Sequence, residues 1–529
     1  RYLSFTPDSG GNQKTFTVSF WFKLTGASDP NGVQSVLSVG TSGGKEAQIR
    51  FEGTVNSQNL NINAYNGSSF VLNLDTDRKF APSDNWTHAV FAVDTRTGVA
   101  AANKVKIYID GVQQTTTGTQ LSTDDYDMLF NNNQEHNIGR QMSSGIGEAD
   151  AYFAEMVMVE GQQLDPSSFG QVDTSTNRWV PKDVSGLTFG DEGWYLEFDG
   201  TFNSGLTTGA GKDSSGNGNH WAEQNDSGSA WATTDRFTDT PSKNFCTWDH
   251  GRNAGHTLTE GALKATGGAV SSSQFDTGLG TMFVSSGKYY WEINRDNDPA
   301  GTDRFRTGVA QDSIAAVMSS DDRKDFWGLS ENGQIHGGGL ALTSGYGVTT
   351  TTGDYIGVAL DMDRHAIYFS KNGTWMNSAS ASGIADGSDL AKAAHTNVIG
   401  SVTPFLQTYD TQVATLRTAS GRWESTAPTG FLELNQDNLD ATASEITAFS
   451  WIKNRDAADS HILVDRLRGV GKTINSDDES IETSEVNTVQ RFLQRGVQVG
   501  NDVQVNTVNE SYVMWQWLSG ETAGTGSVT

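Results

Sequence analysis

Paired carboxylates are the first side chains to weigh in this chain, because cleaving a glycosidic bond needs two of them about 5 to 10 Å apart with divergent pKa values. Two strings place carboxylates at alternate positions, Glu197-Phe-Asp199 and Asp361-Met-Asp363. Alternate residues of a strand face the same side of a sheet. Neither string continues to a third carboxylate in a Glu-x-Asp-x-x-Glu arrangement. We therefore interpret both as solvated strand or turn carboxylates, and we predict no catalytic residue.

Histidine and cysteine provide no stronger catalytic signal. The 9 histidines include no His-Glu-x-x-His string, which a zinc peptidase helix would need. His461 beside Asp465 is interpreted as a packed or surface histidine. Cys246 is the single cysteine, which excludes an intrachain disulfide and a thiolate metal site. We expect Cys246 to be a small buried residue.

Oxygen-rich turns are the candidate calcium sites, because Ca²⁺ prefers carboxylate and amide oxygens. One set is Asp213, Asn217 and Asn219, and a second is Asp124-Asp125 with Asp127. Neither matches the twelve-residue helix-flanked loop with a closing glutamate. Asx-turns would explain the first set without any metal. Ca²⁺ is therefore the one cofactor that these residues suggest. A turn that binds no metal is the alternative interpretation.

Tryptophans outside the regular strands are candidates for stacking on sugar rings, because their large ring faces are apolar and their edges are polar. Those on alternating strands are expected to be core residues: Trp21, Trp86, Trp291 and Trp451. The candidates for glycan stacking lie in turn-like or irregular stretches: Trp221, Trp231, Trp248, Trp375 and Trp423. Linkers between domains also need aromatic side chains for packing, so a structural role is the alternative for each.

Charge and length limit the classes of function and the number of domains. The formal net charge of −27 would repel nucleic acid and anionic lipid, so neither is an expected partner. No apolar run approaches the ~20 residues needed to cross a bilayer, so membrane insertion is not predicted. With 529 residues, the chain exceeds a single core, and we expect about three domains. Because it begins with Arg1, we expect it to lie within a longer product.

Apolar and polar residues alternate with a period of two over many stretches of the chain, which predicts short strands. We expect these strands and the turns between them to position the candidate residues. Asp110-Gly111 and Asn372-Gly373 predict hairpin turns, since type I′ turns need positive φ. Many short strands with no long helical period predict antiparallel sandwiches. The predicted strands of the first region are Phe16–Lys23, Val36–Val39, Leu60–Tyr65, Trp86–Val93, Val105–Ile109 and Ala151–Val159.

The order of these strands resembles the laminin-G/concanavalin-A-like jelly roll over residues 1 to 165. The resemblance is carried by Phe20-Trp-Phe-Lys23, Asn85-to-Val93, Lys106-to-Gly111, Asn137-Ile-Gly139 and the strand from Ala154 to Gly161. It implies two stacked antiparallel sheets. Residues 166 to 249 are expected to be a Gly/Asn-rich connector that packs on this sandwich. The connector pieces between Leu164 and Phe245 resemble those of virion proteins of tailed phages, especially marine ones.

Residues 250 to 435 resemble a SPRY (B30.2-like) sandwich. The resemblance is carried by Lys288-to-Ile293, Thr307-to-Ala310, Asp354-to-Asp361, Ala366-to-Gly373 and Val402-to-Gln407. It implies that the loops between strands bind peptide or protein. Residues 436 to 529 form a C-terminal β-rich module that resembles the last module of the same phage proteins and is interpreted as a possible third sandwich, continuing beyond the end of the chain. The fold class is therefore all-β, with tandem concanavalin-A-like sandwiches and little helix.

Together these resemblances imply a non-enzymatic binding and structural component on the exterior of a phage virion, either a tail fibre or a head fibre/decoration protein. The implied partners are other virion proteins and a host cell-surface glycan or protein, and the implied assembly is a homo-oligomer, commonly a trimer. Two alternatives remain open. One is a bacterial surface adhesin or lectin, and the other, less favoured for want of a carboxylate pair, is a polysaccharide depolymerase.

Overall fold

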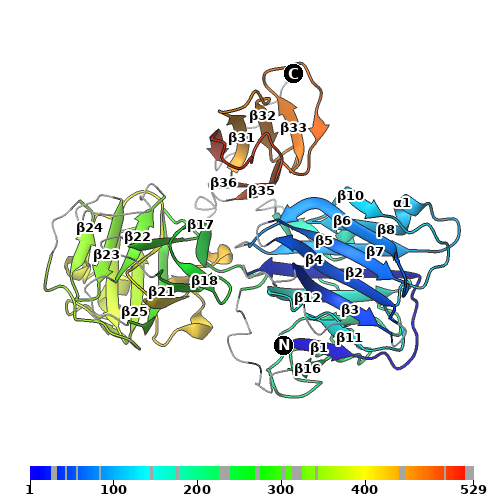
Figure 1. The fold of residues 1–529 in the computed structure, drawn as a ribbon. Helices are drawn as coiled ribbons and strands as arrows, with labels where there is room; N and C mark the ends of the chain where they lie inside the picture. Colours follow the sequence, from blue (N-terminus) through cyan, green and yellow to red (C-terminus); the bar gives the residue numbers. More distant parts are fainter. Residues whose placement is uncertain are drawn as a thin grey trace. The chain divides into compact units, whose positions relative to one another are not determined.

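The computed structural model describes residues 1–25, 32–41, 44–54, 57–82, 85–142, 147–173, 178–225, 231, 237, 239–268, 275–298, 305–312, 325–339, 343–439, 447–493 and 496–518. These residues are almost entirely β-structure in sheets that are nearly all antiparallel, which confirms the predicted fold class (Figure 1). The described residues divide into two compact units, one within residues 1–236 and 447–518 and one within residues 237–439. No helix in the described ranges is long and apolar enough to cross a membrane.

The N-terminal sandwich has two sheets that enclose one large apolar core between them. The first sheet runs in the order β10 (Thr116–Thr119), β6 (Phe70–Phe80), β5 (Ser57–Tyr65), β4 (Glu46–Thr54), β3 (Val33–Gly40), β11 (His136–Ile138), β1 (Tyr2–Phe5) and β16 (Ala222–Gln224). The second runs in the order β15 (Trp194–Leu196), β12 (Ala151–Glu160), β2 (Thr15–Leu24), β7 (Thr87–Asp94), β8 (Val105–Ile109) and β9 (Val112–Gln113). The predicted strands of this region are therefore confirmed.

The sandwich extends beyond the boundary expected at residue 165. Strands β15 and β16 come from the expected connector, and each joins a different sheet. The connector also covers the outer face of the second sheet, where Phe169, Val184 and Phe189 are buried. All ten residues of β2 are consequently buried, although apolar and polar residues alternate along it. The remaining elements here are α1 (Ala101–Lys104), η1 (Pro166–Ser168) and the hairpin of β13 (Gly170–Asp173) with β14 (Arg178–Pro181).

The second module is also a pair of sheets around one core. One sheet runs in the order β17 (Trp248–Ala254), β20 (Asp276–Gly280), β28 (Val402–Thr408), β22 (Arg306–Gln311), β23 (Phe326–Ser330) and β24 (Ile335–Gly337). The other runs in the order β18 (Thr257–Thr259), β19 (Lys264–Thr266), β29 (Val413–Arg417), β21 (Lys288–Asn297), β25 (Tyr355–Asp361), β26 (Ala366–Lys371) and β27 (Thr374–Trp375), with β30 (Leu432–Glu433) parallel to β21. Short helical pieces complete the module: α2 (Ala381–Asp386), η3 (Leu390–Lys392), η4 (Ser420–Arg422) and η5 (Gln436–Asn438).

Both predicted hairpin turns are present. Asp110 and Gly111 have φ values of 49° and 83° and join β8 to β9. Asn372 and Gly373 have φ values of 48° and 79° and join β26 to β27. Two consecutive positive φ values fit the right-handed twist of a hairpin, which is why Asn or Asp followed by Gly predicts it.

The C-terminal module differs from the third sandwich that its sequence suggested. Its sheet runs in the order β34 (Thr483–Ser484), β33 (Lys472–Asn475), β32 (Ile462–Asp465), β31 (Thr447–Asn454) and β37 (Tyr512–Leu518). The hairpin of β35 (Val489–Leu493) and β36 (Gly496–Val499) covers one face of this sheet. In the described part of the module, a single hairpin thus takes the place of a second full sheet.

Candidate functional site

Loops at one end of the second module converge on a buried arginine, Arg295, near the end of β21. Its side chain is 1% exposed, and Nη2 lies 2.7 Å from Oδ2 of Asp298 and 2.9 Å from Oε2 of Glu331. Nη1 donates to the carbonyl of Thr350. The guanidinium also stacks 4.6 Å from the ring centre of Phe305. Because the two carboxylates share one cation in a buried setting, these loops are held in a single arrangement.

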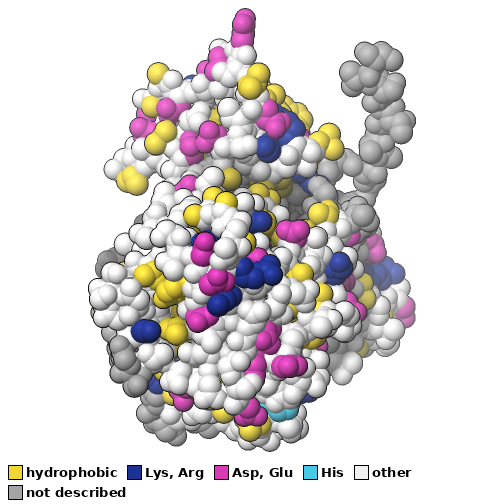
Figure 2. All heavy atoms as spheres, turned by 90° about the vertical axis from the view of Figure 1, so that its right-hand side faces the viewer, with side chains coloured by type: hydrophobic (Ala, Val, Ile, Leu, Met, Phe, Trp, Pro, Cys, Tyr) yellow, Lys and Arg dark blue, Asp and Glu magenta, His cyan; other side chains and the backbone are white. Residues whose placement is uncertain are grey.

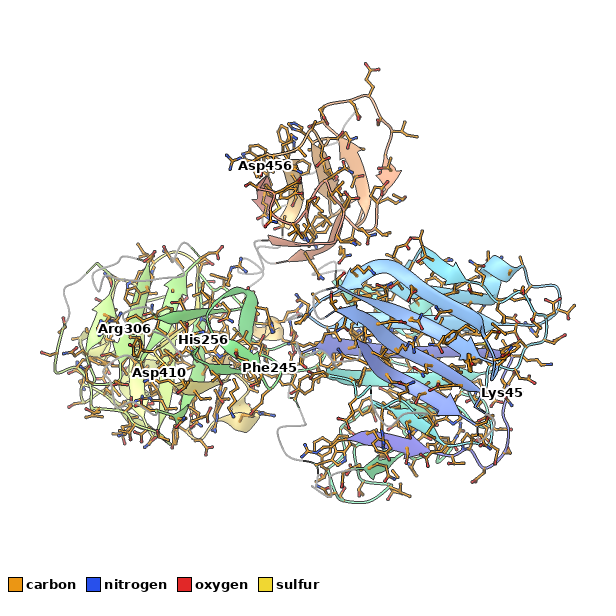
Figure 3. All side chains as sticks on the ribbon, in the orientation of Figure 1. Lys45, Phe245, His256, Arg306, Asp410 and Asp456 are labelled. Carbon is orange, nitrogen blue, oxygen red and sulfur yellow. The ribbon has the colours of Figure 1, made fainter. Side chains whose placement is uncertain are left out.

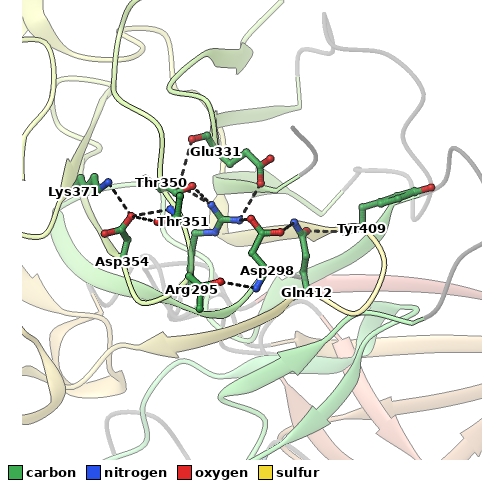
Figure 4. A network of polar contacts seen from close by, with 10 residues as sticks. Arg295, Asp298, Glu331, Thr350, Thr351, Asp354, Lys371, Tyr409 and Gln412 are labelled. Carbon is green, nitrogen blue, oxygen red and sulfur yellow. Dashed lines mark hydrogen bonds and ion pairs between the residues drawn. The ribbon is translucent and has the colours of Figure 1, made fainter. Parts of the chain in front are cut away.

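A fourth loop joins this network through Asp298 (Figure 4). The amide of Gln412 donates to Oδ1 of Asp298 at 3.0 Å, and Oε1 of Gln412 accepts from the backbone amide of Tyr409 at 3.0 Å. The turn between β28 and β29 is therefore fixed to the end of β21. We name these residues, Arg295, Asp298, Glu331, Thr350 and Gln412, the Arg295 network.

A third carboxylate, that of Asp354, fixes the neighbouring turn. Oδ2 of Asp354 accepts from the amide of Thr351 at 2.7 Å and pairs with Lys371 Nζ at 2.9 Å, while Oδ1 accepts from Asn372 at 2.7 Å. Burial opposes ionisation of Asp354, but these donors outweigh it and hold the pKa of its carboxyl below the usual value. Asp354 thereby anchors the β26–β27 hairpin beside the Arg295 network.

Half-buried aromatic side chains lie at the same end of the module. The rings of Phe275 and Tyr409 meet edge to face with their centres 6.4 Å apart, and the Arg306 guanidinium lies 4.7 Å from the centre of the Phe275 ring. In Figure 4 the Tyr409 ring points away from the network, and Figure 3 places Arg306, His256 and Asp410 in this module. The described residues of these connections are joined by buried ion pairs and hydrogen bonds, and groups that are already ordered lose less conformational entropy when they bind a partner.

The tryptophans proposed for glycan stacking have other positions. Trp221 is 1% exposed and packs edge to face on Trp194 at 5.0 Å, and Trp248 is fully buried in the second core. These two cannot stack on a ligand from solvent, and that prediction is wrong for them. They are buried because the connector folds back onto the first sandwich and β17 belongs to the second.

The other three stacking candidates are half-buried and pack on neighbouring aromatic rings. Trp231 lies 5.1 Å from Phe202. Trp375 and Trp423 lie 6.2 Å and 4.9 Å from Tyr290, and the Trp423 indole donates to the carbonyl of Arg417 at 3.0 Å. Each therefore has a packing role, and a role in glycan stacking stays a prediction for these three.

The carboxylate of the first calcium candidate is fully used by the chain itself. Oδ1 of Asp213 accepts from the amides of Tyr195 and Ser215, each at 2.9 Å, and Oδ2 accepts from the Ser215 hydroxyl at 2.8 Å and the Asn219 amide at 2.9 Å. A carboxylate has about four lone-pair positions, so none is left for a cation. The side-chain amides of Asn217 and Asn219 donate to carbonyls of residues 190 to 193.

These three residues therefore fasten one turn to another, and their assignment to a metal is corrected to an Asx-type turn. Within the described ranges, no group of three or more His, Cys, Asp and Glu side chains is arranged to hold a metal ion. Cys246 is buried as expected, and burial raises the pKa of its thiol to about 11. A thiol with this pKa is a poor nucleophile near neutral pH.

A serine and a histidine meet in the first sandwich without forming a catalytic pair. Nε2 of His88 lies 2.8 Å from Oγ of Ser19, and Nδ1 accepts from the indole N–H of Trp179 at 2.9 Å. An indole nitrogen only donates, so Nδ1 carries no proton and Nε2 is the protonated nitrogen. His88 therefore donates to Ser19 and cannot take its proton, as a general base would have to do. Burial lowers the pKa of His88 to about 3 despite the nearby Asp110.

A Gly-x-Ser-x-Gly string does occur at residues 40–44, although Ser42 and Gly43 lie outside the described residues. It lies between β3, which ends at Gly40, and β4, which begins at Glu46. A nucleophile elbow instead joins a strand to a helix. The string therefore has the setting of a hairpin connection.

Glu155, with Glu197 and Asp199 near it, is the group of carboxylates that most resembles an acid–base site. Glu155 lies in a β-bulge of β12 with φ of 49°. Burial raises the pKa of Glu155, the hydroxyl of Tyr195 opposes this by donating to it, and Glu197 and Asp199 raise it further. Glu197 accepts from the Ser214 hydroxyl at 2.5 Å. A pattern of carboxylates at alternate positions of one strand could not identify Glu155, because Glu155 lies 42 positions before Glu197. Only the pairing of their strands in the sheet brings the two residues together.

Comparisons with known proteins agree with the two sandwiches. Residues 1–161 match the concanavalin A-like lectin/glucanases superfamily (laminin G), residues 288–385 match the SPRY domain, and residues 436–529 match a domain of unknown function, DUF7483. The first two matches confirm the resemblances to laminin-G/concanavalin-A-like and SPRY domains. No curated protein matches the chain.

Similar solved structures include two human SPRY domains and a toxin. The SPRY domain of human HERC1 has 19% identity and a TM-score of 0.27, and the match covers 32% of this chain and 96% of that one. A second human SPRY domain has 12% identity and a TM-score of 0.23, with 31% and 96% covered. Stonustoxin has 19% identity and a TM-score of 0.25, with 32% and 27% covered.

Exposed tryptophans do occur, in a place that the sequence interpretation passed over. Trp515 and Trp517 on β37 are 46% and 50% exposed, and Trp451 on β31, expected in a core, is only half-buried. Two tryptophans at alternate positions of one strand are the signal that could have identified this face.

Proposed function

We propose that this chain is a non-enzymatic binding and structural component of a phage virion, exposed on a tail fibre or on a head fibre or decoration. Its concanavalin-A-like and SPRY sandwiches are scaffolds of binding type, and the loop end of the SPRY-like module carries the recognition of a host-surface glycan or protein. The Arg295 network is the observation that supports this most, because it joins described residues from four strand connections at one end of the module. The order of modules and the connector from Leu164 to Phe245 support the phage assignment through their resemblance to phage proteins.

The surface charge fits display on a particle. Acidic and basic side chains are interspersed on the face drawn in Figure 2 rather than separated by sign, while the chain as a whole carries −27. A large net charge of one sign keeps densely displayed copies soluble and mutually repelling. A homo-oligomer, commonly a trimer in fibres, would raise weak loop-mediated binding to useful avidity.

The recognition surface is tested with the full chain on cells of the host strain. Tyr409→Ala removes the aromatic ring that points away from the network, and we expect cell binding to fall about tenfold, as for an interface anchor. Tyr65→Ala is the matched control, because Tyr65 is also half-buried but lies in the first sandwich. Equal binding by Tyr409→Ala and Tyr65→Ala would contradict a site on these loops.

The location is tested by immunogold labelling of purified particles with an antibody against the chain. Label at regular positions on the particle supports the virion assignment. Particles without label, with the chain found on the bacterial surface instead, would favour the adhesin or lectin.

A polysaccharide depolymerase is the second candidate, and the pair of Glu155 and Glu197 is what favours it. A carboxylic acid with a raised pKa is one requirement for glycosidic cleavage, and burial raises the pKa of Glu155. We expect no release of reducing ends from host polysaccharide by the full chain. Release that Glu155→Gln abolishes, with an unchanged unfolding midpoint, would replace the binding proposal with an enzymatic one.

A further inference from the structure

In the described part of the C-terminal module, the sheet has one face covered by apolar packing and one face with exposed aromatic side chains. Ile452 of β31, with Ile462 and Val464 of β32, packs under the β35–β36 hairpin. Successive residues of a strand point to opposite faces, so Phe449 and Trp451 lie on the other side. There Phe449 is paired with Trp517 and Trp451 with Trp515 across the β31–β37 ladder. We name Phe449, Trp451, Trp515 and Trp517 the aromatic platform.

The four rings form two cross-strand pairs that lie one after the other along the strands. The ring centres of Phe449 and Trp517 are 5.0 Å apart, and those of Trp451 and Trp515 are 5.3 Å apart. Residues two apart in a strand are separated by roughly 6.6 to 6.8 Å, so the platform repeats along β37. β37 also lies at the edge of its sheet. A linear ligand of repeating rings fits such a surface better than a compact one does.

Charged side chains beside the platform are satisfied within the module. Lys453, two positions after Trp451 on the same face, donates to the carbonyls of Ala457 and Asp459, each at 2.9 Å. Asp465, opposite Phe449, pairs with Arg468 at 2.5 Å. Lys453 and Asp465 thus have partners within the described part of the module, and the platform offers apolar ring faces beside them, which fits an uncharged ligand.

Net charge decides among the occupants of this face. A polyanion is repelled at long range by a chain that carries −27. An uncharged polymer has no such penalty. Its sugar rings present apolar C–H faces to stack on the aromatic rings and hydroxyls that remain in water, so both parts are satisfied.

We propose that the aromatic platform binds a neutral polysaccharide, with successive sugar rings stacked on its two cross-strand pairs. This inference rests on the proposed binding function and adds a glycan site to the C-terminal module, separate from the SPRY-like loops. Trp515 and Trp517 supply the exposed stacking surface, and Phe449 and Trp451 support them from the neighbouring strand.

The test is affinity electrophoresis of the full chain in native gels that contain dextran, hydroxyethylcellulose or galactomannan. We expect at least one of these polymers to retard the chain. Trp515→Ala combined with Trp517→Ala should weaken that retardation about tenfold for each ring removed, whereas the corresponding pair of Trp→Phe substitutions should keep most of it. Phe70→Ala is the matched control, since Phe70 is an aromatic residue 46% exposed in the first sandwich.

Three results would contradict a glycan site on the aromatic platform. The first is that none of the three polymers retards the chain, and the second is that the double alanine variant is retarded as strongly as the unsubstituted chain. The third result is a dimer in sedimentation velocity that the double alanine variant dissociates. The last result would assign the face to a second copy. Binding to cells that depends on Tyr409 but not on Trp515 and Trp517 would leave the proposed function standing while removing this glycan site.

Discussion

Arg295 is the residue on which the candidate surface of the second module depends. It is 1% exposed, and the two carboxylates it pairs with, on Asp298 and Glu331, are only 8% and 5% exposed. Arg295→Met would leave both carboxylates buried without their cation. We expect a loss of about 3 to 5 kcal/mol in the free energy of unfolding of this module, the usual cost of breaking a buried pair. Urea unfolding of the unsubstituted chain and of Arg295→Met measures this difference in the free energy of unfolding.

Lys14→Met is the control for this variant. Lys14 pairs with Asp125 at 3.7 Å, and the two side chains are 40% and 51% exposed, so the pair contributes little. The unfolding midpoint of Lys14→Met should equal that of the unsubstituted chain. A loss for Arg295→Met no larger than for Lys14→Met would show that the network does not hold the loops.

Buried histidines give the chain a pH dependence with a defined sign. Burial lowers the pKa of His88 to about 3, and those of His136, His256 and His395 to about 4, from 6.5. The unfolded chain therefore binds more protons than the folded chain below pH 6.5. Stability is fully present above that pH and falls as the pH drops toward about 4, by about 1.4 kcal/mol for each pKa unit. Urea midpoints at pH 7.5, 5.5 and 4.5 measure the fall.

A histidine substitution distinguishes the contribution of the buried histidines to this pH dependence from that of the carboxylates. Burial raises the pKa of Glu155, which acts in the opposite direction because that contribution is lost as the pH rises. His88→Gln should reduce the fall in stability between pH 6.5 and 4.5, because it removes one of the histidines whose pKa burial lowers. Identical pH profiles for His88→Gln and the unsubstituted chain would contradict this account.

At the scale of elements, the connector turn around Asp213 fastens β15 and its preceding loop to the first sandwich. Its carboxylate accepts from three backbone amides and one hydroxyl. Asp213→Asn replaces one accepting oxygen with a donor, so we expect a loss of about 1 to 3 kcal/mol in the free energy of unfolding. Calorimetry of the full chain measures it.

The same residue gives a prediction about metal removal. Since the lone pairs of Asp213 are occupied, millimolar CaCl₂ and EDTA should leave the unfolding midpoint of the first sandwich unchanged. A rise with CaCl₂ that Asp213→Asn abolishes would restore the calcium interpretation.

At the scale of the whole molecule, the two large cores lie in different compact units. Separate cores are expected to unfold as separate cooperative units. Scanning calorimetry of the full chain should therefore resolve more than one transition, and Arg295→Met should lower only the transition of the second module. One transition that shifts as a whole would show that the modules unfold together.

The strands, the hairpin turns and the all-β class were determined by the sequence itself. These features are local: alternation of apolar residues marks a strand wherever it lies, and Asp110-Gly111 or Asn372-Gly373 favours a type I′ turn through its own backbone preferences. The order of such strands also identified the two sandwich types. Burial of Trp21, Trp86 and Trp291 could be predicted for the same reason.

Only the tertiary structure decided which faces are covered. Trp221 and Trp248 appear in irregular sequence yet are buried, whereas Trp515 and Trp517 follow a strand pattern yet are exposed. The difference arises because a face is covered by a segment distant in the chain: the connector covers β2, and no equivalent described segment covers β37. The Arg295 network likewise joins residues from 295 to 412. Whether a carboxylate forms an ion pair, stabilises a turn or has a raised pKa depends on neighbours that only the folded chain brings close to it.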